Sequence, residues 1–94
     1  MYIRCVTFKV IDNDIDGTIT AADQLRDKIK ENQLVRSIEV VDLGDGVCMN
    51  LARYDSEADA AEAEEKTNQI YQALSHVIDL SSINVVQGPV VWTL

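Results

Sequence analysis

Residues 35–54 read VRSIEVVDLGDGVCMNLARY, two apolar runs on either side of Gly44-Asp45-Gly46. Both runs, residues 35–43 and 47–54, are rich in β-branched and other apolar residues, which favour strands. Gly and Asp tolerate the positive φ angles that a tight turn between antiparallel strands requires. The stretch therefore predicts a β-hairpin in the middle of the chain.

The segment before the hairpin predicts one strand and one helix. Residues 3–11 (IRCVTFKVI) are typical of a strand and stop at the turn-forming run DNDIDG over residues 12–17. Thr18 or Thr20 is then the expected N-cap of a helix that ends at Asn32. Its apolar positions recur every three to four residues, at Ala21, Ala22, Leu25 and Ile29.

The segment after the hairpin predicts a longer helix and a final strand. Ser56 followed by Asp59 resembles a capping box, and acidic residues crowd the first turns, as a helix N-terminus favours. The helix is predicted to reach about residue 78, with an apolar stripe at Ala58, Ala61, Ile70, Tyr71, Leu74, Val77 and Ile78. Residues 83–86 lead irregularly into a last strand over residues 90–94 (VVWTL).

These elements describe one α+β domain, residues 1–94, in the order β-α-β-β-α-β. Right-handed crossovers then give a four-stranded antiparallel sheet in the order 4-1-3-2 with both helices on one face. The other face is expected to be apolar, because adjacent apolar residues occupy both faces at Val40-Val41, Val85-Val86 and Val90-Val91-Trp92. A second copy would cover such a face, so we expect a homodimer.

Charge and cysteine content narrow the class of partner and the compartment. The chain has 8 basic and 16 acidic residues and a formal charge of −8, which repels nucleic acid phosphates and anionic membranes. We therefore expect no nucleic acid partner and no membrane partner. The first residues lack a signal-peptide pattern, and Cys5 and Cys48 have no CxxC spacing. A cytoplasmic protein with two buried thiols is expected, and a disulfide between neighbouring strands is the alternative.

Two stretches carry a family resemblance. YDSEADAAEA at residues 54–63 and GPVVWTL at residues 88–94 resemble the dimeric α/β-barrel superfamily that includes antibiotic-biosynthesis monooxygenase-like proteins. The resemblance implies a ferredoxin-like fold whose subunits pair sheet against sheet as a dimeric α/β barrel. Members include cofactor-independent oxygenases, heme-degrading enzymes and many proteins with no assigned activity, so no cofactor is expected. The heme-degrading members use an Asn on the first strand, and this chain has none there, which argues against heme degradation.

The candidate catalytic and ligand-contacting residues follow from side-chain chemistry. Trp92 and Tyr54 would line a cavity and stack on a flat organic molecule, although packing in the core or interface is the alternative role. Hydrogen bonds to that molecule would come from Asn50, Arg4 and Arg53, although the alternative for the two arginines is pairing with acidic residues at the rim. His76 would act as a general base or metal ligand, or would simply suit the helix C-terminus as a cation.

An acidic loop at residues 12–23 matches the spacing of an EF-hand calcium loop. The calcium ligands would be two kinds of oxygen, carboxylates and one backbone carbonyl, supplied by Asp12, Asp14, Asp16, Thr18 and Asp23. Gly17 would permit the sharp bend. Against calcium, the incoming segment reads as a strand, Asp23 is shorter than the usual Glu, and no second hand exists. The alternative is an acidic turn that favours the helix N-terminus.

Three functions therefore stay open from the sequence. The first is a ferredoxin-like homodimer that holds a small organic ligand, either as a binder or as a cofactor-independent monooxygenase-like enzyme. The second is a calcium-binding module, and the third is a non-enzymatic assembly or regulatory domain whose apolar sheet is an interface. The sequence does not decide whether the protein is an enzyme.

Overall fold

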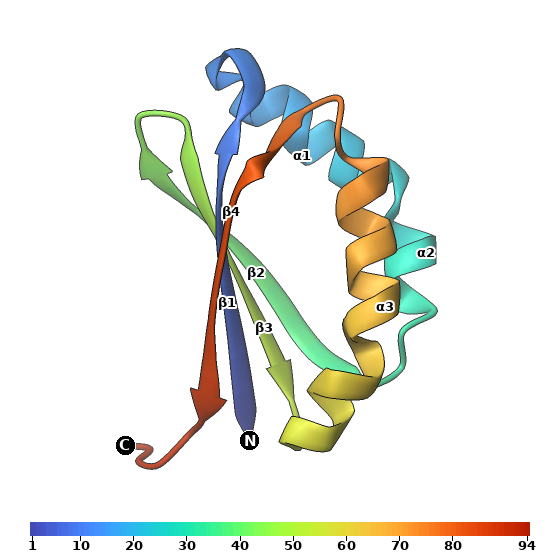
Figure 1. Cartoon of the computed structure of the whole chain (residues 1–94), viewed down its shortest axis with the longest axis vertical. Coiled ribbons are helices and arrows are strands. Elements are labelled where there is room, and N and C mark those ends of the chain that lie inside the picture. Colours follow the sequence, from blue (N-terminus) through green and yellow to red (C-terminus); the bar gives the residue numbers. More distant parts are fainter.

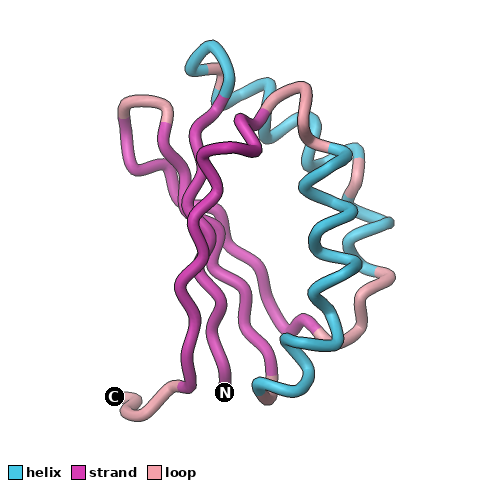
Figure 2. The backbone as a smooth tube through the Cα atoms, viewed as in Figure 1, coloured by secondary structure: helices cyan, strands magenta, loops and turns pink.

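Four antiparallel strands form one sheet, and all helices lie on one of its faces (Figure 1, Figure 2). The computed structural model describes residues 1–94 throughout. The strands are β1 (Tyr2–Val10), β2 (Val35–Gly44), β3 (Val47–Tyr54) and β4 (Ile78–Pro89). The helices are α1 (Ile15–Gln24), α2 (Arg26–Lys30) and α3 (Glu57–Ala73), with a short 3₁₀ turn η1 (Ile11–Asn13) after β1.

The strand order β2-β3-β1-β4 is the predicted order read from the opposite edge of the sheet. Both neighbours of β1 are antiparallel to it, and so are β2 and β3 to one another. The prediction of a ferredoxin-like α+β fold is confirmed.

The central hairpin forms where the sequence predicts it. Asp45 and Gly46 have φ angles of 55° and 75°. A tight hairpin turn of type I′ needs positive φ at both central residues, because its twist then matches that of the strands. Asp and Gly are among the residues that reach this region at low cost, so the turn forms where the sequence predicts it, and an irregularity between Asp42 and Gly44 shifts the register of β2 against β3 beside it.

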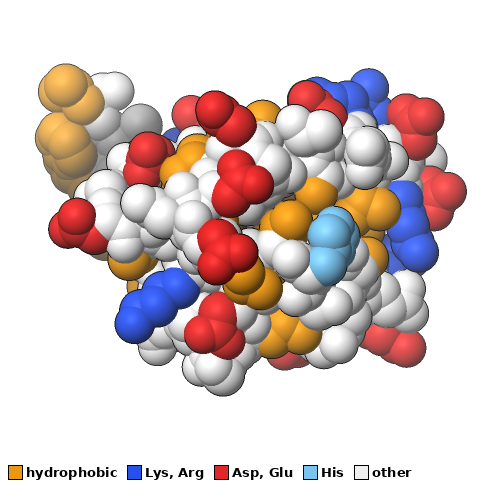
Figure 3. Space-filling view, turned by 90° about the horizontal axis from the view of Figure 1, so that it is seen from above, with side chains coloured by type: hydrophobic (Ala, Val, Ile, Leu, Met, Phe, Trp, Pro, Cys, Tyr) orange, Lys and Arg blue, Asp and Glu red, His pale blue; other side chains and the backbone are white.

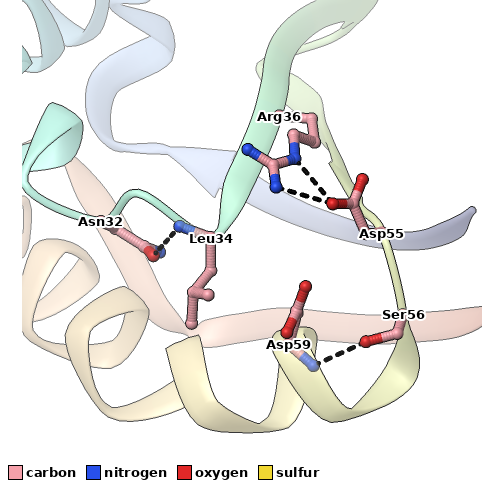
Figure 4. A network of polar contacts seen from close by, with 6 residues as sticks. All are labelled: Asn32, Leu34, Arg36, Asp55, Ser56 and Asp59. Atoms are coloured by element: carbon pink, nitrogen blue, oxygen red, sulfur yellow. Dashed lines mark hydrogen bonds and ion pairs between the residues drawn. The ribbon is translucent and has the colours of Figure 1, made fainter.

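The start of α3 also follows the prediction. The Ser56 hydroxyl accepts a hydrogen bond from the Asp59 backbone N–H at 3.2 Å, which caps the helix (Figure 4). The preceding residue, Asp55, pairs with Arg36 of β2 at 2.6 Å. The same corner holds the loop before β2, where Asn32 accepts from the Leu34 backbone N–H (Figure 4). Local polar contacts thus fix the point where β3 turns into α3.

The first helical segment departs from the prediction at both ends. Asp14, and not Thr18 or Thr20, is the N-cap, since its carboxylate accepts from the Gly17 N–H at 2.9 Å. The helix therefore begins at Ile15, inside the acidic run that was expected to be a loop. It is interrupted at Leu25 (φ −97°, ψ 4°), which separates α1 from α2. An Asx cap is worth about 1 kcal/mol, enough to decide between neighbouring starting points.

The end of α3 and the position of the last strand were predicted wrongly. The helix ends at Ala73, and β4 already begins at Ile78, which pairs with Val10 of β1. Val77 and Ile78 continue the helical spacing of apolar residues, but both are β-branched and suit a strand. Pairing with β1 decides between the two patterns, because it provides hydrogen-bond partners for the backbone N–H and C=O groups of this segment.

Residues 90–94 are not a strand. The pairing of β4 with β1 runs out at Pro89, which lies opposite Tyr2, the first residue of β1. One further backbone hydrogen bond joins the Val90 N–H to the Met1 carbonyl at 2.9 Å. Beyond it the tail leaves the sheet beside the N-terminus (Figure 1). A β-branched segment without a partner strand has no ladder to join, whatever its propensity.

The core between sheet and helices consists of two buried clusters. The larger one contains residues from both halves of the chain, namely Val6, Phe8, Val10, Ala21, Cys48, Tyr71, Leu74 and Ile78. The smaller one lies near the start of β1 and α3 and contains Tyr2, Ala52, Tyr54, Ala60 and Ala63.

None of the helices has the length and the hydrophobicity needed to span a membrane.

Candidate functional site

Two polar side chains interrupt the apolar face of the sheet that meets the helices. Alternate residues of a strand point to the same side, so Arg4 of β1 and Asn50 of β3 both face the helices. The register pairs Arg4 with Ala52 and Val6 with Asn50, which makes the two polar residues diagonal neighbours. They lie at the junction of the two core clusters.

A cavity of about 760 Å³ lies between this face and the helices. Half of the residues that line it are hydrophobic, 16 of 32. Its size is that of a pocket for a small organic molecule. Ile38 and Val40 of β2 line it and are 41% and 53% exposed, so the helices leave this part of the sheet uncovered and the cavity open to solvent.

Asn50 and Tyr71 form the polar centre of the cavity. Nδ2 of Asn50 donates to the hydroxyl of Tyr71, which reaches it from α3 at 2.8 Å. Oδ1 of the same amide is buried and has no hydrogen-bond partner. Phe8 holds the Tyr71 ring by an edge contact with 6.2 Å between ring centroids. Buried polar atoms without partners are uncommon in proteins, so this oxygen, which water does not reach, is an unfavourable feature of the packing around Asn50.

Arg4 contributes a positive charge to the same wall. The residue is 8% exposed and lines the cavity. The three ion pairs of the chain involve Arg26, Arg36 and Arg53, so Arg4 has no carboxylate within 4 Å. Its N–H groups have no hydrogen-bond partner in the chain but are not cut off from solvent, so they are free to contact a molecule in the cavity.

The surroundings keep the Tyr71 hydroxyl protonated. Burial raises the pKa of Tyr71, while the Asn50 hydrogen bond and the charge of Arg4 oppose that rise. Since the ordinary pKa of a tyrosine is already near 10, Tyr71 is a neutral hydroxyl at pH 7. It accepts from Asn50 and keeps its own proton, which it can donate into the cavity.

The predicted ligand-contacting residues fall into two groups. Asn50, Tyr54 and Arg4 all line the cavity. Arg53 faces the opposite side of the sheet, where it pairs with Glu39 of β2. Tyr71, the partner of Asn50, was expected only as part of the apolar helix stripe. A hydroxyl-bearing ring in an otherwise apolar stripe was the signal for it.

Trp92 and His76 are not part of the cavity. Trp92 lies in the tail beyond β4 and is 74% exposed, so the expected stacking wall is absent. His76 is exposed in the turn between α3 and β4, because the helix ends before it. Both placements follow from the early end of α3 and the early start of β4.

The acidic loop does not form an EF-hand site. Asp14 is engaged as the helix cap, and Asp16 and Thr18 are already helical, with the Thr18 hydroxyl donating to the Asp14 carbonyl. The carboxylate of Asp23 pairs with Arg26 at 2.6 Å. No group of three or more His, Cys, Asp or Glu side chains is placed to hold a metal ion. Asp12, the first expected ligand, lies in η1 with a φ of 56°. Early helix formation has replaced the loop that would wrap a cation.

No protein-family model matches the chain, and no curated protein matches it. Solved structures do match over nearly the whole length. A protein described as an antibiotic biosynthesis monooxygenase is 17% identical with a TM-score of 0.70, covering 97% of this chain and 99% of its own. The chain has the fold of these proteins.

Two further structures with this fold are described as dimeric. A dimeric ferredoxin-like protein from an uncultured marine organism is 10% identical with a TM-score of 0.76, covering 99% of this chain and 90% of its own. A dimeric protein of unknown function and ferredoxin-like fold from Bacteroides fragilis is 14% identical with a TM-score of 0.65 and covers 95% of each chain. At such identities the likeness establishes the fold, and the site must be argued from this chain's own residues.

Proposed function

We propose that this protein binds a small organic molecule in the cavity between sheet and helices and works as a homodimer. The observation that carries the proposal is the cavity itself, whose lining is half hydrophobic and includes the guanidinium of Arg4 and the hydrogen-bonded pair of Asn50 and Tyr71. An apolar pocket with a few placed polar groups is the usual form of a small-molecule site.

The polar groups have defined hydrogen-bonding capacities. Arg4 is a donor, and the Tyr71 hydroxyl, which accepts from Asn50, keeps its own proton to donate. All three lie on or against neighbouring strands, so their positions are set by the register of β1 and β3 and by the helix packed over them. A bound molecule would thus be held in one orientation while its apolar part fills the remaining volume.

Monooxygenase-like chemistry is the enzymatic form of the proposal. It is supported by the fold shared with proteins described as antibiotic biosynthesis monooxygenases. Without a cofactor, the bound molecule itself is the reductant: one of its CH₂ groups becomes C=O with one atom of O₂, and the two hydrogens leave with the other oxygen atom as water. The residues of this chain would hold the molecule and limit its contact with bulk water. Incubation of the protein with the molecule under ¹⁸O₂ distinguishes an enzyme from a binder, because an enzyme adds ¹⁸O to the molecule and a binder leaves it unchanged.

The homodimer is supported by the face of the sheet that has no helices. The register aligns Leu51, Cys5 and Val86 across three strands of this face, and Val41 lies opposite Met49. Val86 is 59% exposed in a single chain. A second copy on this face would remove these side chains from water and leave the cavity on the other face accessible. The related folds described as dimeric agree with this arrangement.

A cytoplasmic location is part of the same proposal. Cys5 and Cys48 are both free thiols. They lie on adjacent strands but point to opposite faces of the sheet, so they cannot pair with each other. Free thiols are compatible with a reducing compartment.

The binding proposal is tested by filling the cavity. Ala22 of α1 lines it and is half-buried, so Ala22→Phe should block it. Ala73 is exposed at the end of α3 and lies outside the lining, which makes Ala73→Phe the matched control. Calorimetric titration with 2-naphthol, 2-naphthoate and 2-naphthamide should detect binding to the wild type and to Ala73→Phe, with at least about tenfold weaker binding to Ala22→Phe. Equal binding to all three proteins would contradict the proposal.

A further inference from the structure

The basic residues of this acidic chain gather around the cavity. Of the chain's 8 basic residues, six line it, whereas only three of its 16 acidic residues do so. The six are Arg4, Arg26, Lys28, Lys30, Arg36 and Lys66. The lining thus carries a surplus of three positive charges in a chain whose formal charge is −8. Outside the lining the chain has 13 acidic but only two basic residues, and several acidic side chains are visible in Figure 3.

Most of the cavity's positive charge is not neutralised within the chain. Arg26 and Arg36 pair with acidic side chains, each at 2.6 Å. Arg4 and the three lysines have no carboxylate within 4 Å. The three lysines are exposed to solvent. Arg4 is only 8% exposed, so a counter-ion for its charge would have to lie in the cavity.

We infer that the cavity takes an organic acid, an apolar carbon body that carries a carboxylate. This inference rests on the proposed binding function and specifies its ligand class. The carboxylate would pair with the guanidinium of Arg4, which lines the cavity and whose fork of N–H groups matches two carboxylate oxygens.

A carboxylate fits this wall better than a phosphate ester. The Arg4 guanidinium balances a single negative charge, and the Tyr71 hydroxyl supplies one further donor. A phosphate monoester carries up to two charges and three acceptor oxygens at pH 7, for which the interior offers too few donors. The unpaired lysines on the rim would draw the anion toward the cavity, and salt would weaken this effect.

The test compares two molecules of nearly equal shape that differ in charge. 2-Naphthoate is a carboxylate, and 2-naphthamide is its neutral amide. Arg4→Met removes the buried charge and keeps an unbranched apolar side chain. Lys9→Met removes one positive charge from the same strand, and Lys9 is exposed and outside the cavity lining. Calorimetric titration at low and high salt measures all six pairings of these proteins and ligands.

We expect the wild type and Lys9→Met to bind naphthoate at least about tenfold more tightly than naphthamide, because a charged hydrogen-bonded pair contributes at least this much. Arg4→Met should lose the preference, because loss of the guanidinium weakens binding of the charged naphthoate at least about tenfold more than binding of the neutral naphthamide. Naphthoate binding to the wild type should weaken as salt rises. Arg4→Lys should restore part of the preference for naphthoate. A cooperative unfolding transition of this variant would show that the fold accommodates a charged side chain at this position.

The results separate the ligand class from the binding function. If naphthamide binds the wild type as tightly as naphthoate, or if Arg4→Met keeps the preference, the organic-acid inference is overturned and the cavity is still a binding site. If neither molecule binds the wild type, both the inference and the proposed function fail.

Discussion

The hydrogen bond between Asn50 and Tyr71 makes a quantitative prediction about stability. Tyr71→Phe keeps the ring and its edge contact with Phe8 but removes the hydroxyl that accepts from Asn50 Nδ2 at 2.8 Å. Because Oδ1 of Asn50 already lacks a partner, the variant leaves the half-buried amide with no hydrogen-bond partner in the chain. A buried polar group stranded in this way costs about 1–3 kcal/mol.

We therefore expect Tyr71→Phe to lower the free energy of unfolding by about 2 kcal/mol. For a domain of this size that corresponds to a fall in Tm of roughly 10 °C. Asn50→Leu has two opposing effects on stability. It removes the unpartnered Oδ1, which is stabilising, and it leaves the Tyr71 hydroxyl without its partner, which is destabilising, so the two effects partly cancel. The double variant Asn50→Leu/Tyr71→Phe removes every member of the network and should approach the wild-type stability.

Urea unfolding followed by far-ultraviolet circular dichroism measures these free energies at one fixed protein concentration. Trp92 fluorescence is a poor probe, because this side chain is 74% exposed in the folded chain. The double variant should be more stable than the sum of the two single changes predicts, by about 1–3 kcal/mol. Additivity within about 0.5 kcal/mol, or a Tyr71→Phe variant as stable as the wild type, would refute the reasoning.

Three shorter predictions follow from other contacts. The hydrogen bond to Arg36 lowers the carboxyl pKa of Asp55 in the folded state. The pair therefore stabilises the fold at pH values above the ordinary carboxyl pKa of 3.8, and this stabilisation is lost as the pH falls through the lower pKa of the folded state. Asp55→Asn should therefore flatten the acid limb of a plot of stability against pH. Because the pKa of Tyr71 is raised, an ultraviolet titration of the folded protein should show one tyrosine that ionises above the ordinary pKa of 10. This titration step should be absent in Tyr71→Phe. Since the folded state holds this proton more tightly, stability should fall as pH rises through that range. Val86→Glu on the open sheet face should give a sedimentation mass near the 10.5 kDa of one chain, whereas the wild type and Ala73→Glu should give about twice that value. A monomeric wild type would contradict the dimer.

Local chemistry explains which parts of the fold were predictable. The Asp45-Gly46 turn and the Ser56 cap depend on residues within a few positions, so their geometry follows from the sequence alone. The boundaries that were wrong depend on partners far along the chain. Ile78 joins a strand because Val10 is there to pair with it, and Trp92 lies outside the sheet because β1 has ended.

The candidate site was only partly predictable for the same reason. Asn50 and Arg4 stand out in the sequence as polar interruptions of apolar strands. Tyr71 does not, because its spacing fits the core stripe of a helix and its role arises from contact with Asn50, 21 positions away. The calcium motif failed in the opposite way. Its residues have the right spacing, but the cap at Asp14 starts the helix early and removes the loop.

The sequence by itself determined the order of strands and helices, the hairpin, the antiparallel sheet with one apolar open face, and the acidic charge. Each of these follows from residue periodicity, turn chemistry or composition, which are local or additive properties. The tertiary structure decided where α3 gives way to β4, which side chains meet across the cavity, and how the few basic residues come to surround it. These depend on contacts between residues far apart in the chain, and such contacts exist only once the strands have paired and the helices have packed against them.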